Sequence, residues 1–297
     1  MLFRIRYTTR YAYDEPAYNS QNDARLAPND GPGQRCIAFK IEVDPPAEIS
    51  EYKDAFGNRA HSISIKAPHR KLTIVAASTV ERIEVPIEHP RRMTFEEYLS
   101  DDESRTAQYR DFLEASRYVP FSRRLRKFFW SARPQMSEDV ASYATRIIGS
   151  VRDQFGYDRA ATHVHSTVDD ILTAGGGVCQ DFAHLTIGLF RLAGVPARYV
   201  SGYLAPNSTN DPKAPPPELA SHAWIEILLP GADWLGFDPT HRQPAMLRHI
   251  RVAIGRDYAD VAMIRGSYQT AGGRQVMSYE LEVREATEEE AGAAARS

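Results

Sequence analysis

The sequence predicts an α+β fold: an N-terminal antiparallel β-sandwich followed by a unit that mixes helices and strands. Three observations predict this class. Residues 1–88 consist of strand-like runs, several with period-two alternation, separated by turn residues. From Thr94 to about Phe155 the apolar residues instead follow a helical period. From Ser166 to about Val283 a long apolar helix pattern is followed by further strand-like runs.

The predicted domains follow from these changes in pattern. We assign residues 1–88 to a β-sandwich domain and residues 89–285 to a second domain that begins with a helical segment. Residues 286–297 are rich in Ala and Glu, and we expect this tail to be disordered.

Composition narrows the function classes. With 42% hydrophobic and 25% charged residues, the chain has the make-up of an ordinary globular protein. The net charge of -3 predicts neither a nucleic-acid partner nor a membrane surface. The start, MLFRIRYTTRYAY, alternates apolar and charged residues and lacks the apolar centre of a signal peptide. Two cysteines make no disulfide framework, so we expect a cytoplasmic protein with free thiols.

The elements of the first two segments have clear boundaries. Turn signals at residues 28–33, 45–46 and 56–58 divide the N-terminal strands. Thr94 and Glu97 form a predicted capping box at the start of the helical segment, and Pro120 and Pro134 divide that segment into shorter helices.

The third segment holds the candidate chemistry. A short helix ends at three glycines, residues 175–177, and Cys179 then begins a helix that is apolar around most of its circumference and ends at Gly194. Such a helix is expected to be buried. A strand, a polar Pro-rich loop over Asn207–Leu219 and a hairpin around residues 230–233 follow.

Cys179 is a candidate nucleophile because of its place at a helix start. The unpaired N–H groups and the dipole of a helix N-terminus favour the thiolate, which is the reactive form. A cysteine nucleophile also needs a base and a group that orients the base. His222 in SHAW and Asp238 in FDPT supply both types of residue.

The functional interpretation is a Cys–His–Asp triad. Cys179 attacks a carbonyl, His222 transfers the proton, and Asp238 holds the imidazole, with the Cys179 N–H as an oxyanion donor. Each residue also has a structural interpretation: an inert buried thiol, a structural histidine and an aspartate that forms a turn before proline. From the residues alone both interpretations stay open.

The hairpin poses a geometric problem for the triad. If residues 230–233 form a four-residue loop, Leu229 faces Trp234 and Asp238 faces Ile225, on the wrong face for His222. We therefore expect a bulge or a different loop boundary.

Other residues near the motifs have structural interpretations that we prefer. Asp181 fits a helix-dipole role better than a substrate contact, and His184 fits a core or interface residue. His163 and His165 fit a loop better than a metal site. Trp224 fits a cleft wall or the core equally well.

Four stretches carry a family resemblance: GGGVCQDFAHL, ARYVSGYL, SHAWIEILLPGADWLGFDPT and GRDYADVAMIRGSY. In them the sequence resembles the bacterial transglutaminase-like cysteine protease family. RYTTRYAYDEPA, ARLAP and DAFGNRAHSISI resemble the N-terminal β domain that accompanies it. The resemblance implies Cys179 as nucleophile, His222 as base and Asp238 as the third member. It also implies a papain-like, transglutaminase-like core, in which a central helix packs on an antiparallel sheet.

We expect a hydrolase that cleaves a peptide, protein or isopeptide amide through an acyl-enzyme, without cofactor or metal. Acyl transfer to an amine, as in a transglutaminase, is the first alternative, and a silent scaffold on the same fold is the second. A metal-dependent hydrolase that uses Cys179, His222 and Asp238 as ligands is less favoured. The sequence gives no oligomeric state.

Overall fold

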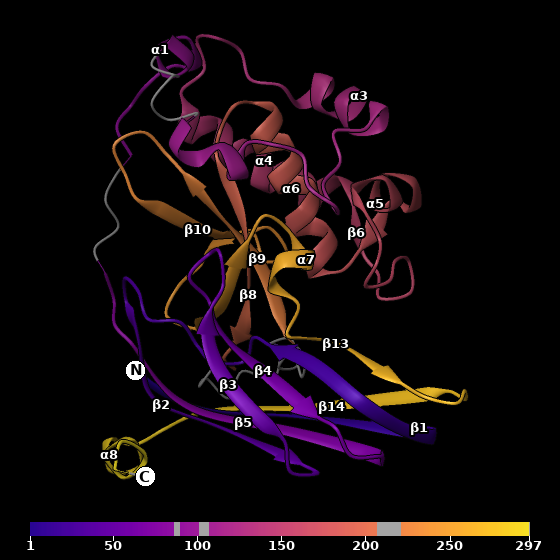
Figure 1. The fold of residues 1–297 in the computed structure, drawn as a ribbon. Coiled ribbons are helices and arrows are strands. Elements are labelled where there is room, and N and C mark those ends of the chain that lie inside the picture. Colours follow the sequence, from indigo (N-terminus) through magenta and orange to yellow (C-terminus); the bar gives the residue numbers. More distant parts are fainter. Residues whose placement is uncertain (86–89, 101–106, 207–220, 297) are drawn as a thin grey trace.

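The chain forms two apolar cores: one lies between a layer of helices and a central sheet, and the other between that sheet and an N-terminal sheet, which is lowest in Figure 1. The structure is a computed structural model, and it describes residues 1–85, 90–100, 107–206 and 221–296. The predicted loop over Asn207–Leu219 therefore lies outside the described residues. The α+β class is confirmed, and the core has the predicted transglutaminase-like arrangement of a central helix on an antiparallel sheet.

The N-terminal domain is one seven-stranded antiparallel sheet. Its first five strands are β1 (Leu2–Ala24), β2 (Gln34–Asp44), β3 (Glu48–Lys53), β4 (Arg59–Ile65) and β5 (His69–Arg82). The predicted sandwich takes the form of two halves that share β1: its first half pairs with β5 and its second half with β4. Buried Phe3 and Ile5 alternate with exposed Arg4 and Arg6, so one face of this strand reaches the core.

The C-terminal part of the chain completes this sheet. β13 (Ile264–Gln269) and β14 (Gln275–Glu285) both pair with β1. Both strands fall within the predicted unit over residues 89–285, because local pattern does not show which partner a strand finds across the chain.

The prediction of a disordered tail is wrong. Residues Glu288–Ala294 form α8, which begins with a capping box between Thr287 and Glu290. Glu290 also pairs with Arg284 of β14. The run of Ala and Glu residues therefore belongs to a capped helix, and both residue types favour helix.

Helices cover the upper layer in Figure 1. The elements are α1 (Phe95–Ser100), a 3₁₀ turn (Arg110–Phe112), α3 (Arg123–Ala132), α4 (Val140–Gln154), α5 (Val168–Ala174) and α6 (Cys179–Leu192), with the short strands β6 (Gly156–Tyr157) and β7 (Gly176–Gly177). The Thr94–Glu97 capping box is confirmed by reciprocal hydrogen bonds. α6 is buried along nearly its whole length, as its apolar circumference predicts.

The second sheet lies under α6. Its five strands run in the order β11-β10-β9-β8-β12. They are β8 (Ala197–Leu204), β9 (His222–Leu228), β10 (Trp234–Asp238), β11 (Gln243–Pro244) and β12 (His249–Gly255), and α7 (Tyr258–Val261) follows. Ala223, Ile225 and Ile227 of β9 join the apolar core around α6. The alternate residues of β9 therefore point to the other face of the sheet.

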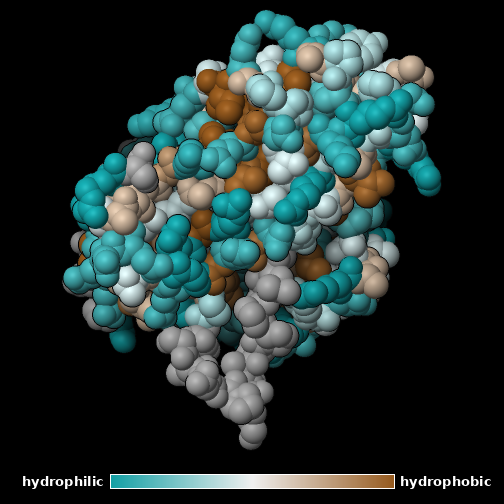
Figure 2. Space-filling model, turned by 90° about the horizontal axis from the view of Figure 1, so that it is seen from below, coloured by the Kyte–Doolittle hydropathy of each residue, from teal (hydrophilic) through white to brown (hydrophobic). Residues whose placement is uncertain are grey.

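The surface seen from below is mainly hydrophilic, with hydrophobic residues showing in a broken band between hydrophilic ones (Figure 2). No helix in the described part of the chain is long and apolar enough to span a bilayer.

Replacing Leu281 tests whether β14 is an integral part of the N-terminal sheet. Leu281 is buried in the core of that sheet, whereas Val276 on the same strand is 63% exposed. We expect Leu281→Ala to lower the free energy of unfolding by about 2–5 kcal/mol, because it leaves a cavity. Val276→Ala is the matched control and changes it by about 0.5 kcal/mol or less. Urea unfolding measures both, and equal effects would contradict the pairing.

Candidate active site

The glycines before Cys179 allow two backbone segments to approach closely. Gly175 ends α5 with a φ of 74°, a conformation that suits glycine. Gly177 then pairs with Tyr157 in a short parallel ladder between β7 and β6. A Cβ on Gly177 would lie 2.6 Å from Asp181 Oδ2. The segment that leads to Cys179 is thus fixed by contacts that a larger residue would break.

Asp181 fixes the first turn of α6. Its Oδ2 accepts the backbone N–H of Val178 at 2.8 Å and the hydroxyl of Thr162 at 2.5 Å. Burial raises the pKa of Asp181, while these hydrogen bonds act in the opposite direction. The carboxylate therefore works within the fold, on the residue just before Cys179, in line with the preferred interpretation of a helix-start role.

Cys179 is the first residue of α6 and is half-buried against the apolar core. Its N–H lies in the first turn, where a helix has no acceptor of its own to offer. α6 packs against β9, the strand that begins at His222. The fold thus brings the element with Cys179 onto the element with His222.

The hairpin between β9 and β10 resolves the register problem. Trp234 pairs with Leu228, and Phe237 pairs with Ile225. The loop is one residue longer than the sequence analysis assumed, so the different loop boundary, and not a bulge, is the correct alternative. With this register Asp238 lies on the same face as His222.

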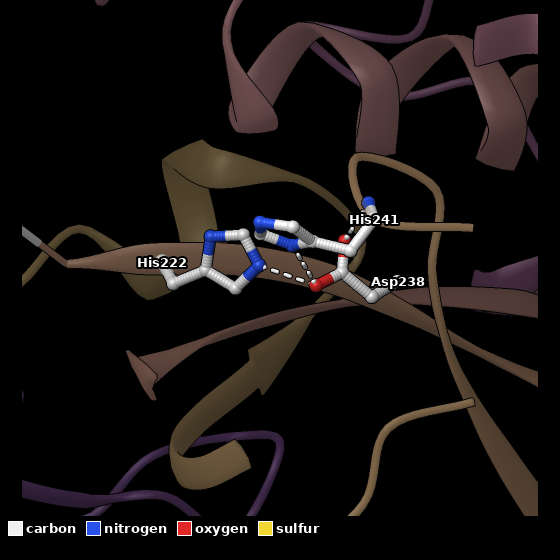
Figure 3. Close-up of side chains that lie close together, drawn as sticks. All are labelled: His222, Asp238 and His241. Atoms are coloured by element: carbon white, nitrogen blue, oxygen red, sulfur yellow. Dashed lines mark hydrogen bonds and ion pairs between the residues drawn. The ribbon is translucent and has the colours of Figure 1, made fainter. Parts of the chain in front are cut away.

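Asp238 is the centre of a buried polar cluster (Figure 3). His222 Nε2 and His241 Nδ1 each lie 2.7 Å from Asp238 Oδ2, and His249 Nε2 lies 3.1 Å from it. Oδ1 accepts the backbone N–H groups of Thr240 and His241, which form a turn. The side chains of His222 and Asp238 are completely buried. These hydrogen bonds join His222 to Asp238 and do not include Cys179.

The cluster holds Asp238 in its charged form. Burial alone would raise the pKa of Asp238, but hydrogen bonds from His222, His241 and His249 hold it well below its usual range. Burial lowers the pKa of His249. His249 Nδ1 accepts the backbone N–H of Met246, so its proton lies on Nε2 and is donated to Asp238. Asp238 thus keeps a charge that can orient and stabilise a protonated His222.

His241 and His249 are site residues that were not predicted from the sequence. His241 has a signal in retrospect, because an aspartate that forms a turn brings the residue three positions on back to its carboxylate. His249 has none. It lies on β12, which β9 and β8 separate from β10 in the sheet order, and its contact with Asp238 requires the sheet to curl.

Metal coordination would compete with these hydrogen bonds. His222, Asp238 and His241 offer ligand atoms within 4.8 Å of one another. The same atoms form the hydrogen bonds between the imidazoles and the carboxylate, so an ion would have to replace those bonds.

The remaining predicted residues have structural roles. His184 is buried in the core and accepts the backbone N–H of Tyr258 at its Nε2. His163 and His165 lie in a loop, where His163 Nδ1 accepts the backbone N–H of His165. Trp224 is buried, stacks beside His222 with 6.1 Å between ring centroids, and lines a cavity. Its burial fits the core alternative, and the cavity that it lines does not include Cys179.

A half-buried thiol at the start of a central helix, with a buried histidine–aspartate pair on the sheet beneath, defines the papain-like, transglutaminase-like class of fold. Comparison with known proteins supports this class of fold. Residues 3–81 match the bacterial transglutaminase-like N-terminal region, and residues 131–239 match the transglutaminase-like superfamily. The chain belongs to the bacterial transglutaminase-like family.

Full-length relatives support this assignment. An uncharacterized protein of Mycobacterium leprae is 33% identical over 91% of this chain and 94% of its own length. An uncharacterized protein of Mycobacterium tuberculosis is 32% identical over 95% of this chain and 92% of its own length. A crystal structure from Cytophaga hutchinsonii, described as that of a candidate cysteine protease, shares the fold with a TM-score of 0.73. The two sequences are 24% identical, and the match covers 96% of this chain and 90% of the other.

Substitution of Gly177 tests the close approach that positions Cys179. We expect Gly177→Ala to lower the free energy of unfolding by about 1–3 kcal/mol, because the methyl group meets Asp181. Gly149→Ala is the matched control, since a Cβ there meets nothing within 4 Å and alanine favours its helix. Thermal unfolding compares the two variants, and equal stability would contradict the steric argument.

His184 gives the protein a specific acid sensitivity. Burial lowers the pKa of His184 from 6.5 to about 4, Asp257 opposes this shift and Arg191 adds to it. As the pH falls, the unfolded chain therefore takes up this proton before the folded chain does. The stability contributed by neutral His184 is full above about pH 6.5 and is lost as the pH falls toward 4.

The measurement is the free energy of unfolding in urea between pH 7 and 5. We expect His184→Gln to flatten its slope by up to about 1.4 kcal/mol per pH unit. The slope is compared and not the absolute stability, so a generally weakened variant still gives an answer. An unchanged slope would show that His184 does not titrate as described.

Proposed function

We propose that this protein is a cysteine-dependent hydrolase of peptide, protein or isopeptide amides, with Cys179, His222 and Asp238 as its catalytic residues. The observation that carries the proposal is the completely buried 2.7 Å hydrogen bond between His222 and Asp238. A buried carboxylate needs compensating hydrogen bonds, and here an imidazole on the strand packed against the Cys179 helix supplies one. Family membership supports the same assignment.

The proposed reaction has two halves. In the first, Cys179 Sγ attacks the amide carbonyl and its proton passes to His222, which then gives that proton to the departing nitrogen as the C–N bond breaks. The products are an amine and a thioester on Cys179. In the second half His222 takes a proton from water, the hydroxyl attacks the thioester, and the proton returns to the sulfur as the acid leaves.

The two ring nitrogens of His222 have different roles in this reaction. Nε2 faces Asp238, so we assign proton transfer with Cys179 to Nδ1. Asp238 holds the ring orientation and stabilises the imidazolium without itself taking the proton, in keeping with its lowered pKa. The Cys179 N–H at the helix start is our candidate oxyanion donor.

A cytoplasmic location and a peptide or protein amide as partner are part of the same proposal. The acceptor is water in this account. Transfer to a primary amine uses the same three residues and differs only in what resolves the thioester.

Product analysis on an amide peptide library tests the proposal. We expect wild-type protein to release free acid and amine, and Cys179→Ala and His222→Ala to release neither. Asp238→Asn should lower turnover by about 10²–10⁴-fold, because the imidazole loses its orienting charge. Cys36→Ala is the matched control and keeps full activity, since Cys36 lies in the N-terminal sheet.

The outcomes separate the alternatives. An amine-containing product that replaces the free acid when a primary amine is added would favour a transglutaminase. Turnover that persists in Cys179→Ala would rule out the thiol mechanism. Loss of turnover with a chelator, restored by zinc, would favour the metal-dependent alternative.

A further inference from the structure

A cavity of about 430 Å³ lies between the N-terminal domain and the second sheet. Its walls come from the segment after β5, from the loop before β2, and from the face of β9 and β10 that points away from α6. Cavities of this size are typical of small-molecule sites. Cys179 is not among the residues that line the cavity.

The inner wall carries more positive than negative charge. Arg198 and Arg251 both pair with Glu226, at 2.5 and 3.3 Å, and all three side chains are mostly buried. Arg82 is half-buried beside them. Two further acids, Glu84 and Asp233, line the cavity but are exposed at its rim. The buried part of the wall thus has three guanidinium groups and one carboxylate.

Arg82 is the cation that lacks a counter-ion. Its guanidinium donates to the backbone carbonyls of Gly33, Met246 and Leu247, and no carboxylate of the described residues lies within 4.0 Å of it. Burial, with a further contribution from Arg251, lowers the pKa of Arg82 to about 10, although Glu226 opposes the shift. A half-buried cation in this setting is stabilised by an anion.

The rest of the cavity is apolar and aromatic. Trp224 and Trp234 form part of its wall. Ile83, Val85 and Met246 also line it and are 54%, 47% and 49% exposed, although each is large and hydrophobic. An apolar ligand body would cover these side chains and gain the free energy of removing them from water.

Two residues that line the cavity, Trp224 and His249, also contact the candidate catalytic pair His222 and Asp238. The ring of Trp224 lies 6.1 Å from that of His222 and 5.2 Å from that of His249. His249, another lining residue, donates to Asp238. Trp224 and His249 therefore connect the wall of the cavity to His222 and Asp238.

We propose that this cavity binds a small carboxylate with an apolar body, such as the C-terminal residue of a peptide, with its carboxylate at Arg82 and its body against Trp234, Val85 and Met246. The bound anion adds negative charge on the side of the sheet where His222 lies and so favours protonation of His222. Occupancy therefore raises the reactivity of Cys179. The binding part of this inference does not depend on the proposed hydrolase function.

Calorimetry on the full chain tests binding with two probes that differ only in charge, N-acetyl-L-phenylalanine and its neutral amide. We expect the acid to bind with a Kd of about 1 mM or tighter, and the amide about tenfold more weakly, because only the acid compensates Arg82. Equal affinity for acid and amide, or no binding of the acid up to about 10 mM, would overturn the proposal.

Substitutions of residues that line the cavity test whether the acid binds there. Arg82→Gln should weaken binding of the acid about tenfold, to the level of the amide. The matched control is Arg70→Gln, an exposed arginine of the same sheet that pairs with Glu15 and does not line the cavity. Because Arg82 also holds backbone carbonyls, Val85→Asp provides a second variant at the exposed mouth that keeps Arg82 and adds a carboxylate that repels the acid. Unchanged binding in both cavity variants would refute the location.

Alkylation of Cys179 by iodoacetamide tests the coupling. With the acid at saturation we expect the alkylation rate of Cys179 to rise by about twofold or more, and that of Cys36 to stay constant. The amide should leave both rates unchanged. Binding of the acid without a change at Cys179 would overturn the coupling and leave the site as a binding site alone.

Discussion

The structure around the candidate active site depends on one buried carboxylate. Asp238 accepts hydrogen bonds from three imidazoles and two backbone N–H groups, and it is completely buried. A carboxylate in an apolar interior is costly unless such partners compensate it. This requirement fixes the register of the hairpin between β9 and β10 and the turn after β10. It also draws β12 toward β10 across a curled sheet, and it sets the orientation of His222.

The chain path explains how this site is held between two structural layers. The strands that follow the segment with Cys179, His222 and Asp238 return to β1, so the N-terminal sheet anchors that segment at both of its ends. The same arrangement places Arg82, from the end of β5, beside Arg251 and Glu226 of the second sheet. The contact between the two sheets therefore carries buried charge as well as apolar packing, and it lies directly behind His222 and Asp238.

Local signals in the sequence predicted the local parts of this structure well. Three glycines before Cys179, the capping residues Thr94 and Glu97, and the apolar circumference of α6 each act within a few residues, and each prediction is confirmed. The approach of His222 to Asp238 was also predicted, but only with an unresolved register, because a single loop residue decides which face of a strand a side chain takes.

The features that sequence reasoning missed depend on contacts between distant segments. His249 meets Asp238 only because the sheet curls, and β14 finds β1 from the opposite end of the chain. Neither contact leaves a periodic pattern. The helical tail was missed for a different reason: its capping box, Thr287 and Glu290, is readable in the sequence, but the ends of chains are commonly poorly ordered.

The central claim is that the His222–Asp238 pair activates the thiol of Cys179, and competitive alkylation measures this most directly. Cys36 is an internal reference, because burial raises the pKa of its thiol even though Arg59 opposes the shift. Mass spectrometry after brief exposure to iodoacetamide at neutral pH gives both rates in one sample. We predict that Cys179 reacts faster than Cys36 in the wild type and that His222→Ala removes most of this difference. Equal rates in the wild type, or an advantage of Cys179 that His222→Ala leaves unchanged, would contradict the account.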